Sequence, residues 1–324
     1  MPPRFTVEPC ADEDVVGERE KKLFHSMVGA LNYAANHTRP DITFATSRLA
    51  SVVSRPSHEQ LEATKRLVRY VSASESVGLG YSAMRQRLQR GAADLGKGEM
   101  LLTCYTDASF NSLKADGTSI RGYVCMFGGG AMSWRSKKQN EVGQSSCETE
   151  YMALHHGAKE VVSLRRLLEE IGVCQKEPTV IFCDNESAVK LAKNACLHGL
   201  TKHIRPKSHW VRRLLDKEVR LEIVKTHQQA ADILTKRLAE SEHWKGMKLA
   251  GMSGYHLLEF DIILTMDISS MTFLSLTARA ATPNVSRLLA IVVTDPSFAS
   301  TAASALIAQL VDFAAACRLE TYLH

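Results

Sequence analysis

Four carboxylate side chains stand where the sequence pattern passes from one predicted element to the next. Asp107 follows the apolar run LLTCYT, and Asp184 ends the apolar run TVIFC. Glu150 lies in the first turns of a long amphipathic helix within SSCETEYMAL, and Asp232 opens a helix within QQAADILTK. Because strand carboxyl ends and the adjoining helix starts meet at one edge of an α/β sheet, we expect the four side chains to converge.

Four converging acids would have a definite chemistry. The carboxylates would repel one another and have raised pKa values unless a cation neutralised them. Magnesium and manganese prefer such hard oxygen ligands, completed by water and substrate phosphates. Two such ions about 4 Å apart can activate a water molecule and stabilise the leaving oxygen of a phosphoryl displacement. The acids therefore predict a divalent-metal site that acts on phosphate esters.

Each acid also has a structural interpretation. Asp107 alone would commonly be a turn residue or a cap, and Asp184 alone would cap the helix that follows it. Glu148 and Glu150 both suit the start of a helix, where the helix dipole favours acids. We prefer Glu150 as the site residue because it precedes the small and apolar helix face that includes Gly157. The order of all four acids along the chain favours the metal site.

The surrounding pattern predicts a helical part followed by an α/β part. Apolar residues recur at helical spacing through residues 21–81, with Asp41 placed to cap a second helix and Pro56 and Ser57 at the start of a third. The strands are expected at 101–105, 118–127, 131–135, 179–183 and 220–225. The helices after the first strand are expected at 145–171, 186–194, 207–217 and 230–242. This order predicts a mixed sheet with antiparallel and parallel neighbours.

Charge and composition divide the chain further. The 324 residues carry 40 basic and 35 acidic side chains, a net charge of +5, of which the last 74 residues contribute −3. The remaining 250 residues therefore carry +8. We predict a disordered or ragged N-terminus over 1–20, a helical segment over 21–81, a linker over 82–99, an α/β domain over 100–250, and an unrecognised tail over 251–324. Strands at 262–264 and 288–293 and a helix at 303–315 are expected in the tail.

Six motifs together resemble the ribonuclease H segment of copia-type retrotransposon polyproteins. They are YTDASF, GGGAMSWRSKKQ, SSCETEYMAL, FCDNESAVKLAKN, TKHI and ADILTK, in the family's order and spacing. Upstream, the segment from GALNYAANHTRPD to LVRYV resembles the connection region at the end of the reverse transcriptase. The resemblance runs from about Lys21 to about Met252.

This resemblance implies a ribonuclease H-like fold: a mixed five-stranded sheet with flanking helices, preceded by a small helical connection (thumb-like) segment. It also implies cleavage of the RNA strand of RNA–DNA hybrids, with Asp107, Glu150, Asp184 and Asp232 as catalytic and metal-binding acids. The cleavage would use two magnesium ions, with manganese as the alternative, and its products would carry a 5′-phosphate and a 3′-hydroxyl. The chain contains no Asp-Asp pair, so a polymerase active site is not expected here and the polymerase portion of a reverse transcriptase is a candidate partner.

Contacts to a hybrid are expected from polar and basic side chains. Nucleic-acid duplexes are held largely through their phosphates, and a hybrid also presents 2′-hydroxyls across a wide minor groove. The candidate substrate-binding residues are Arg135, Lys137, Lys138, Asn185, Lys202, His203 and His227. The resemblance also implies that His227, shortly before Asp232, lies in the loop where cellular relatives place a histidine that assists product release; the alternative is an exposed loop histidine. For any single lysine or arginine, a solvated surface position is the preferred interpretation, and Trp134 and Trp210 are expected to be packing anchors.

Two other functional classes compete with this interpretation. One is a non-catalytic nucleic-acid-binding remnant of a truncated retrotransposon polyprotein. The other is a small-molecule α/β enzyme, which would need a glycine-rich phosphate loop after the first strand, where this chain has TDASF. The eight cysteines form no C-x-x-C pair, and neither a signal peptide nor a membrane segment is expected. We therefore expect an intracellular, cytoplasmic protein, in virus-like particles if the element is active, with the nucleus as the alternative.

Overall fold

The computed structural model describes residues 14–81, 100–110, 118–139, 143, 145–193, 205–254, 262–267 and 272–278. Its N-terminal part is helical and consists of α1 (Glu18–His37), η2 (Pro40–Ile42), α2 (Thr43–Ala50) and α3 (His58–Ala73). The predicted apolar face of α1 is buried, including Phe24, Val28 and Leu31. Ser57 caps α3 as expected, because its hydroxyl accepts the Gln60 N–H while the Gln60 side chain accepts the Ser57 N–H.

Two details of the helical segment differ from the prediction. Asp41 does not cap α2, since it lies within η2 and its buried carboxylate binds Arg39 instead. Residues 77–81 form strand β1 (Val77–Tyr81) rather than helix. The sequence VGLGY places two glycines in this stretch, which disfavours a helix. β1 pairs on one side with β7 (Met252–Gly254) and on the other with β8 (Ile262–Asp267), which pairs with β9 (Thr272–Ala278).

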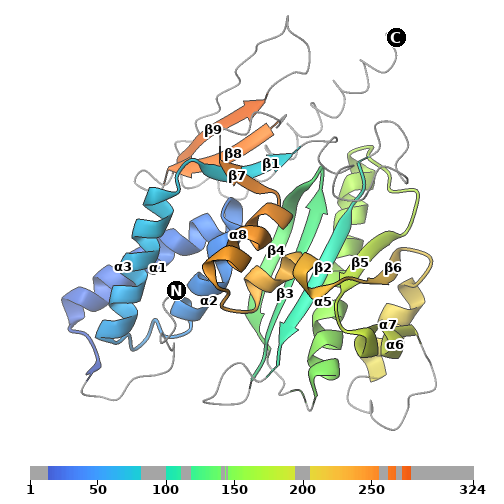
Figure 1. Cartoon of the computed structure of the whole chain (residues 1–324), viewed down its shortest axis with the longest axis horizontal. Helices are drawn as coiled ribbons and strands as arrows, with labels where there is room; N and C mark the ends of the chain where they lie inside the picture. The colour runs from blue at the N-terminus through green and yellow to red at the C-terminus, as the bar shows by residue number, and fades with distance from the viewer. Residues whose placement is uncertain are drawn as a thin grey trace, which may run out of the picture.

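The main sheet has five strands in the order β4-β3-β2-β5-β6. These strands are β2 (Thr103–Ser109), β3 (Ile120–Phe127), β4 (Gly130–Lys138), β5 (Thr179–Cys183) and β6 (Val219–Ile223). β2, β3 and β4 are antiparallel neighbours, whereas β5 runs parallel to β2 and β6 parallel to β5. Gly128 and Gly129 have positive φ in the β3–β4 turn, the predicted hairpin. The expected mixed five-stranded sheet with flanking helices is confirmed (Figure 1).

Helices cover both faces of this sheet. One face carries α5 (Ser146–Glu170), with α6 (Glu186–Lys193) and α7 (Arg205–Leu214) beside it. The other face carries η4 (Ala230–Leu234), which follows η3 (Thr226–Gln228) and precedes α8 (Glu240–Leu249). The single helix predicted over 230–242 is therefore wrong. The chain makes one short turn at η4, where Thr235 turns its hydroxyl to the sheet, and starts a new helix at two acids, Glu240 and Glu242, that suit a helix N-terminus.

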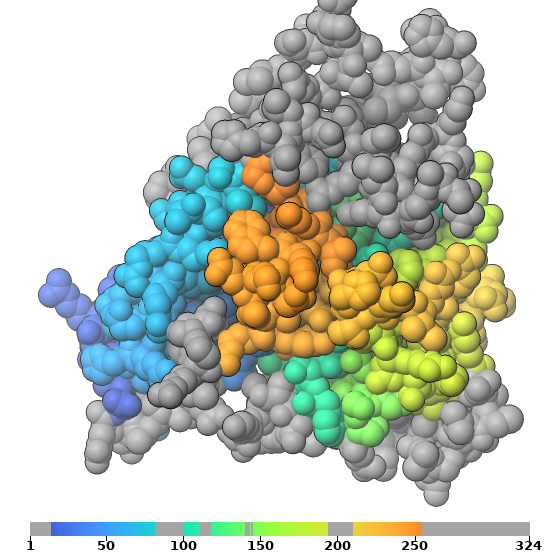
Figure 2. Space-filling view, viewed as in Figure 1, coloured from blue at the N-terminus to red at the C-terminus, as the bar shows by residue number. Residues whose placement is uncertain are grey.

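The helical segment packs against the edge of the sheet at β4. The indole Nε1 of Trp134 donates to the Ala35 carbonyl oxygen at 2.7 Å, and the Ser47 hydroxyl donates to the Ser136 carbonyl oxygen at 3.3 Å. Figure 2 shows residues 225–254, in orange, between the N-terminal helices in blue and the α6–α7 side of the sheet in yellow-green. The prediction that Trp134 is a packing anchor is confirmed.

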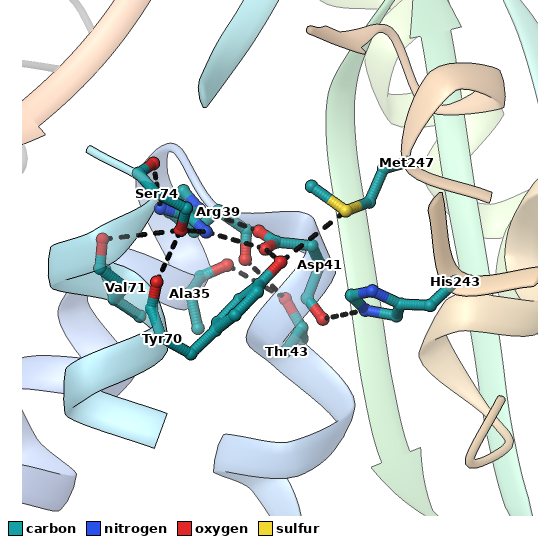
Figure 3. A network of polar contacts seen from close by, with 9 residues as sticks. All are labelled: Ala35, Arg39, Asp41, Thr43, Tyr70, Val71, Ser74, His243 and Met247. Carbon is teal, nitrogen blue, oxygen red and sulfur yellow. Dashed lines mark hydrogen bonds and ion pairs between the residues drawn. The ribbon is translucent and has the colours of Figure 1, made fainter. Parts of the chain in front are cut away.

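A buried polar network joins the helical segment to α8 (Figure 3). Arg39 donates to both carboxylate oxygens of Asp41, at 2.9 and 2.8 Å, and to the carbonyl and hydroxyl of Ser74. The Tyr70 hydroxyl donates to Asp41 Oδ2 at 2.8 Å. The ring of His243 in α8 lies 3.1 Å from the Asp41 carbonyl oxygen through Nε2. The linker predicted over 82–99 and the tail elements predicted at 288–293 and 303–315 lie outside the described residues, whereas β8 confirms the strand predicted at 262–264.

Candidate active site

Asp107 lies within the central strand β2, not after it, and only 1% of its surface is exposed. The Thr235 hydroxyl donates to Asp107 Oδ2, and the Lys236 Nζ lies 3.5 Å from Oδ1. Both partners come from the end of η4, so this short helix closes over the carboxylate. Asp107 is thus a buried acid on the middle strand of the sheet, where the surrounding elements meet.

Glu150 is held over β2 by the close approach of α5. A Cβ on Gly157 would collide with the Thr106 methyl group, so glycine is needed where the helix crosses the strand. Glu150, in the second turn of α5, is 6% exposed. Glu148 is partly exposed beside the Ser145 cap, outside the acid groups described below. The preference for Glu150 over Glu148 agrees with this placement.

The other two acids come from the end of β5 and from η4. Asp184 follows Cys183 directly, and Asp232 lies in the middle of η4. A Cβ on Gly122 of β3 would lie 2.8 Å from Leu234 Cβ and from Thr235 Cγ2. Only glycine at this position lets η4 lie against the sheet, which brings Asp232 to the edge where β2 and β5 meet.

The four acids converge as the sequence predicts. Ligand oxygens of Asp107, Asp184 and Asp232 all lie within 4.8 Å of one another, and so do ligand atoms of Glu150, Asp184 and Cys183. Asp184 belongs to both groups and links them. We refer to Asp107, Glu150, Asp184 and Asp232 as the acid cluster.

Burial and mutual repulsion raise the pKa values of Asp107, Glu150 and Asp232. Burial raises the pKa of Glu150 to about 9, with Asp107 and Asp184 adding to the effect. Burial, with Asp107, raises the pKa of Asp232 to about 6. The pKa of Asp107 is also raised by burial, against the opposing influence of Lys236 and the Thr235 hydroxyl. The protein concentrates more negative charge here than its own groups neutralise.

The unused oxygens of the cluster fit a hard divalent cation. Asp107 Oδ1, Glu150 Oε2 and Asp232 Oδ1 are buried, and within the described part of the chain Glu150 Oε2 accepts no hydrogen bond while the other two share the Lys236 ammonium. Buried carboxylate oxygens of this kind are costly unless a partner is supplied. Several carboxylates within reach of one another are the donor set that magnesium and manganese prefer. The residues present therefore suit such an ion.

Two contacts of the cluster were not foreseen from the sequence: those of Thr235 and Lys236. Lys236 Nζ lies 2.8 Å from Asp232 Oδ1 as well as 3.5 Å from Asp107 Oδ1. These carboxylates raise the pKa of Lys236 in spite of its partial burial. The signal was the i, i+4 spacing of Asp232 and Lys236 in ADILTK, which places an acid and a base on one side of a helical turn.

The predicted substrate-binding residues have different locations. Arg135, Lys137 and Lys138 are exposed on β4, which is two strands away from β2 and Asp107. Across the sheet, Asp107 pairs with Gly122 of β3, and Gly122 pairs with Ser136 of β4. The Asn185 side chain accepts the Ala188 N–H at 3.0 Å and so caps α6. Lys202 and His203 lie outside the described residues. Trp210 packs on the core beside His155, with ring centroids 5.2 Å apart, which confirms the packing role predicted for it.

His227 lines a cleft that opens beside the acid cluster. The cleft has a volume of about 530 Å³ and runs between η3, η4 and α8, with Asp232 in its wall. The remaining lining residues are Thr226, Gln229, Leu238, Glu242, Lys245, Gly246 and Leu249. His227 is exposed on η3, so its side chain faces solvent at the cleft, next to one of the four acids.

Among the helices of the described residues, none combines the length and the apolar character needed to span a membrane. No protein-family model matches the chain. One solved structure, LC11-RNase H1 in complex with an RNA/DNA hybrid, aligns with 41% of this chain and 93% of its own, at 16% identity and a TM-score of 0.33.

Sequence relatives extend over most of the chain. The retrovirus-related Pol polyprotein from transposon TNT 1-94 of Nicotiana tabacum is 35% identical over 237 residues, which cover 73% of this chain. That from transposon RE1 of Arabidopsis thaliana is 36% identical over 220 residues, or 67% of this chain. The chain spans only 17% and 14% of the lengths of these two polyproteins. Together with the motifs and their order, these identities show that the chain belongs to the copia-type retrotransposon Pol polyprotein family.

Proposed function

We propose that the chain is a divalent-metal-dependent nuclease that cleaves the RNA strand of RNA–DNA hybrids, as the ribonuclease H part of a retrotransposon reverse transcriptase. The observation that supports this most is the acid cluster, in which four carboxylates from four separate elements converge around a single ammonium group, that of Lys236. A structural role would not need this arrangement, because buried acids that outnumber their partners cost stability. The strand order and the family membership agree with the same activity.

In this proposal, Asp107, Glu150, Asp184 and Asp232 hold magnesium, or manganese in its place. The bound ions supply an activated water and neutralise the charge that develops on the leaving 3′ oxygen of the RNA. The protein's own contribution is positional: Gly157 and Gly122 let α5 and η4 approach the sheet, and these elements fix Glu150 and Asp232 beside Asp107. The exposed Arg135, Lys137 and Lys138 would contact backbone phosphates, and His227 would act at the cleft beside Asp232.

The test is cleavage of a labelled RNA–DNA hybrid in magnesium by the wild-type chain and by Asp107→Asn and Glu150→Gln. We expect only the RNA strand to be cut, and each variant to lose about 10³-fold in rate, as is typical when a group that stabilises developing charge is removed. Glu148→Gln is the matched control. It removes an acid two residues before Glu150, at the same helix start but outside the acid cluster, and should keep the activity. Equal activity in all four proteins would refute the site.

The non-catalytic alternative makes a different forecast for the same assay. A remnant would bind the hybrid through its basic surface, yet cut neither strand at any magnesium or manganese concentration. Binding of the intact hybrid by a folded wild-type protein, measured by fluorescence anisotropy in parallel, would then replace the nuclease proposal with a binding function.

A further inference from the structure

The acid cluster contains a cation that belongs to the protein. The Lys236 Nζ lies 2.8 Å from Asp232 Oδ1 and 3.5 Å from Asp107 Oδ1. Among the ion pairs of the described residues, Lys236 is the only basic group that contacts these carboxylates. One ammonium group therefore pairs with two of the four acids.

Lys236 uses the oxygens that a metal ion would also need. Asp107 Oδ1 and Asp232 Oδ1 are the oxygens nearest the ammonium, and both are buried. A divalent cation bound between Asp107 and Asp232 would lie within a few ångströms of the Lys236 ammonium. The two positive charges would repel each other at this range.

The side chain also has a route out of the cluster. A third of the Lys236 side chain is exposed, whereas the Asp107 side chain beneath it is 1% exposed. A lysine side chain is a flexible four-carbon stem, so its ammonium can move into solvent without any change in the backbone of η4. The acids are fixed on secondary structure elements, and the lysine is the part that can leave.

We infer that Lys236 is the resident counter-ion of the metal-free acid cluster, and that it leaves Asp107 and Asp232 when a divalent cation binds there. This inference rests on the proposed metal site and adds its regulation. Lys236 is then a positioning residue with two opposite effects. It holds the empty cluster together, and it lowers the affinity of the cluster for metal.

The first test is isothermal titration of the full chain with magnesium chloride, in wild type, Lys236→Met and Lys236→Arg. We expect Lys236→Met to bind magnesium about tenfold more tightly, because a repelling unit charge a few ångströms from the ion is removed. Lys236→Arg keeps the charge and should stay close to wild type. Lys245→Met is the control: Lys245 lines the neighbouring cleft, pairs with Glu242, and should leave the affinity unchanged.

The melting temperature of the metal-free proteins gives an opposite readout for the same variant. Lys236→Met should melt lower than wild type and Lys245→Met in the presence of a chelator, and the difference should shrink in saturating magnesium. A merely structural lysine would lower the melting temperature equally in both conditions and would not tighten metal binding.

A measurement on the wild type covers the case in which Lys236→Met does not fold. Lysines are acylated briefly with and without magnesium, and the sites are quantified by mass spectrometry. Labelling of Lys236 should rise severalfold with magnesium, and that of Lys245 should not. Magnesium binding with unchanged labelling, or with unchanged affinity in a folded Lys236→Met, would overturn the inference. Failure of the wild type to bind magnesium would instead overturn the proposed function.

Discussion

Asp41 and Asp107 are almost equally buried, at 5% and 1% exposure, and are treated in opposite ways by their surroundings. Asp41 receives two hydrogen bonds from Arg39 and one from Tyr70 (Figure 3), and these partners outweigh burial and hold its pKa below the usual value. Asp107 receives one from Thr235, and burial leaves its pKa raised. The satisfied acid stabilises the fold, and the unsatisfied acid keeps oxygens available for a ligand.

The largest effect should come from breaking the satisfied network. Arg39→Met leaves Asp41 charged and buried without its partner, a change that costs about 3–5 kcal/mol in other proteins. Urea unfolding followed by circular dichroism measures the loss. The double variant Arg39→Met/Asp41→Leu removes the stranded charge and should recover most of it. A double variant as unstable as the single one would show that packing, and not charge pairing, is what Arg39 supplies.

A smaller loss should follow when η4 is pushed away from the sheet. Gly122→Ala places a methyl group against Leu234 and Thr235, and overpacking of this kind costs about 1–3 kcal/mol. Because η4 carries Asp232, magnesium affinity should weaken in the same variant. Gly29→Ala in α1 is the control, since a Cβ there meets nothing and alanine favours a helix. Stability of Gly122→Ala equal to that of Gly29→Ala would contradict the close approach described for η4.

Removing a charge from the acid cluster should increase the stability of the metal-free protein, whereas the two changes above decrease it. The pKa of Glu150 is raised to about 9 in the folded protein, above its usual value, so the stability that this group contributes is present at low pH and is lost as the pH rises toward 9. Glu150→Gln should therefore raise the free energy of unfolding at pH 8 in a chelator, by at least about 1 kcal/mol. Thermal melts at pH 5 and pH 8 measure it. Glu148→Gln should show no such gain, and a destabilised Glu150→Gln at pH 8 would refute the electrostatic account.

The smallest effect is expected at the contact between the helical segment and β4. Trp134→Phe removes the indole N–H that binds the Ala35 carbonyl oxygen and should cost about 0.5–1.5 kcal/mol, without changing the pH dependence. Trp244→Phe, at a side chain that is 42% exposed, should stay within about 0.5 kcal/mol of wild type. Equal values for the two variants would place Trp134 outside the interface.

Local pattern was sufficient for much of the fold. Alternating and helical spacing of apolar residues located the β3–β4 hairpin, α3 and α5. Gly128 and Gly129 marked the turn of the hairpin, and Ser57 marked the start of α3. The same pattern failed at β1 and at η4, because both depend on partners far along the chain. β1 is a strand only because β7 and β8 pair with it, and η4 ends because Thr235 turns toward Asp107.

The acid cluster was predictable for a similar reason, and its neighbours were not. Acids at strand ends and helix starts converge in any such sheet, so Asp107, Glu150, Asp184 and Asp232 could be proposed from order alone. Lys236 reaches the cluster because it follows η4 closely, and Asp41 pairs with Arg39, which lies two residues earlier in the chain. A sequence read one element at a time does not contain these contacts.

The pairing of β1 with β7 has a consequence for the movement of this unit between proteins. Val77–Leu79 pairs with Met252–Gly254, so the two ends of the segment 77–254, which contains the five-stranded sheet, lie side by side. A folded unit whose two ends meet can be inserted into a single surface loop of a host without forcing the host's flanking residues apart. The short β1–β7 ladder therefore holds the two ends of the segment 77–254 in the arrangement that insertion into one host loop requires.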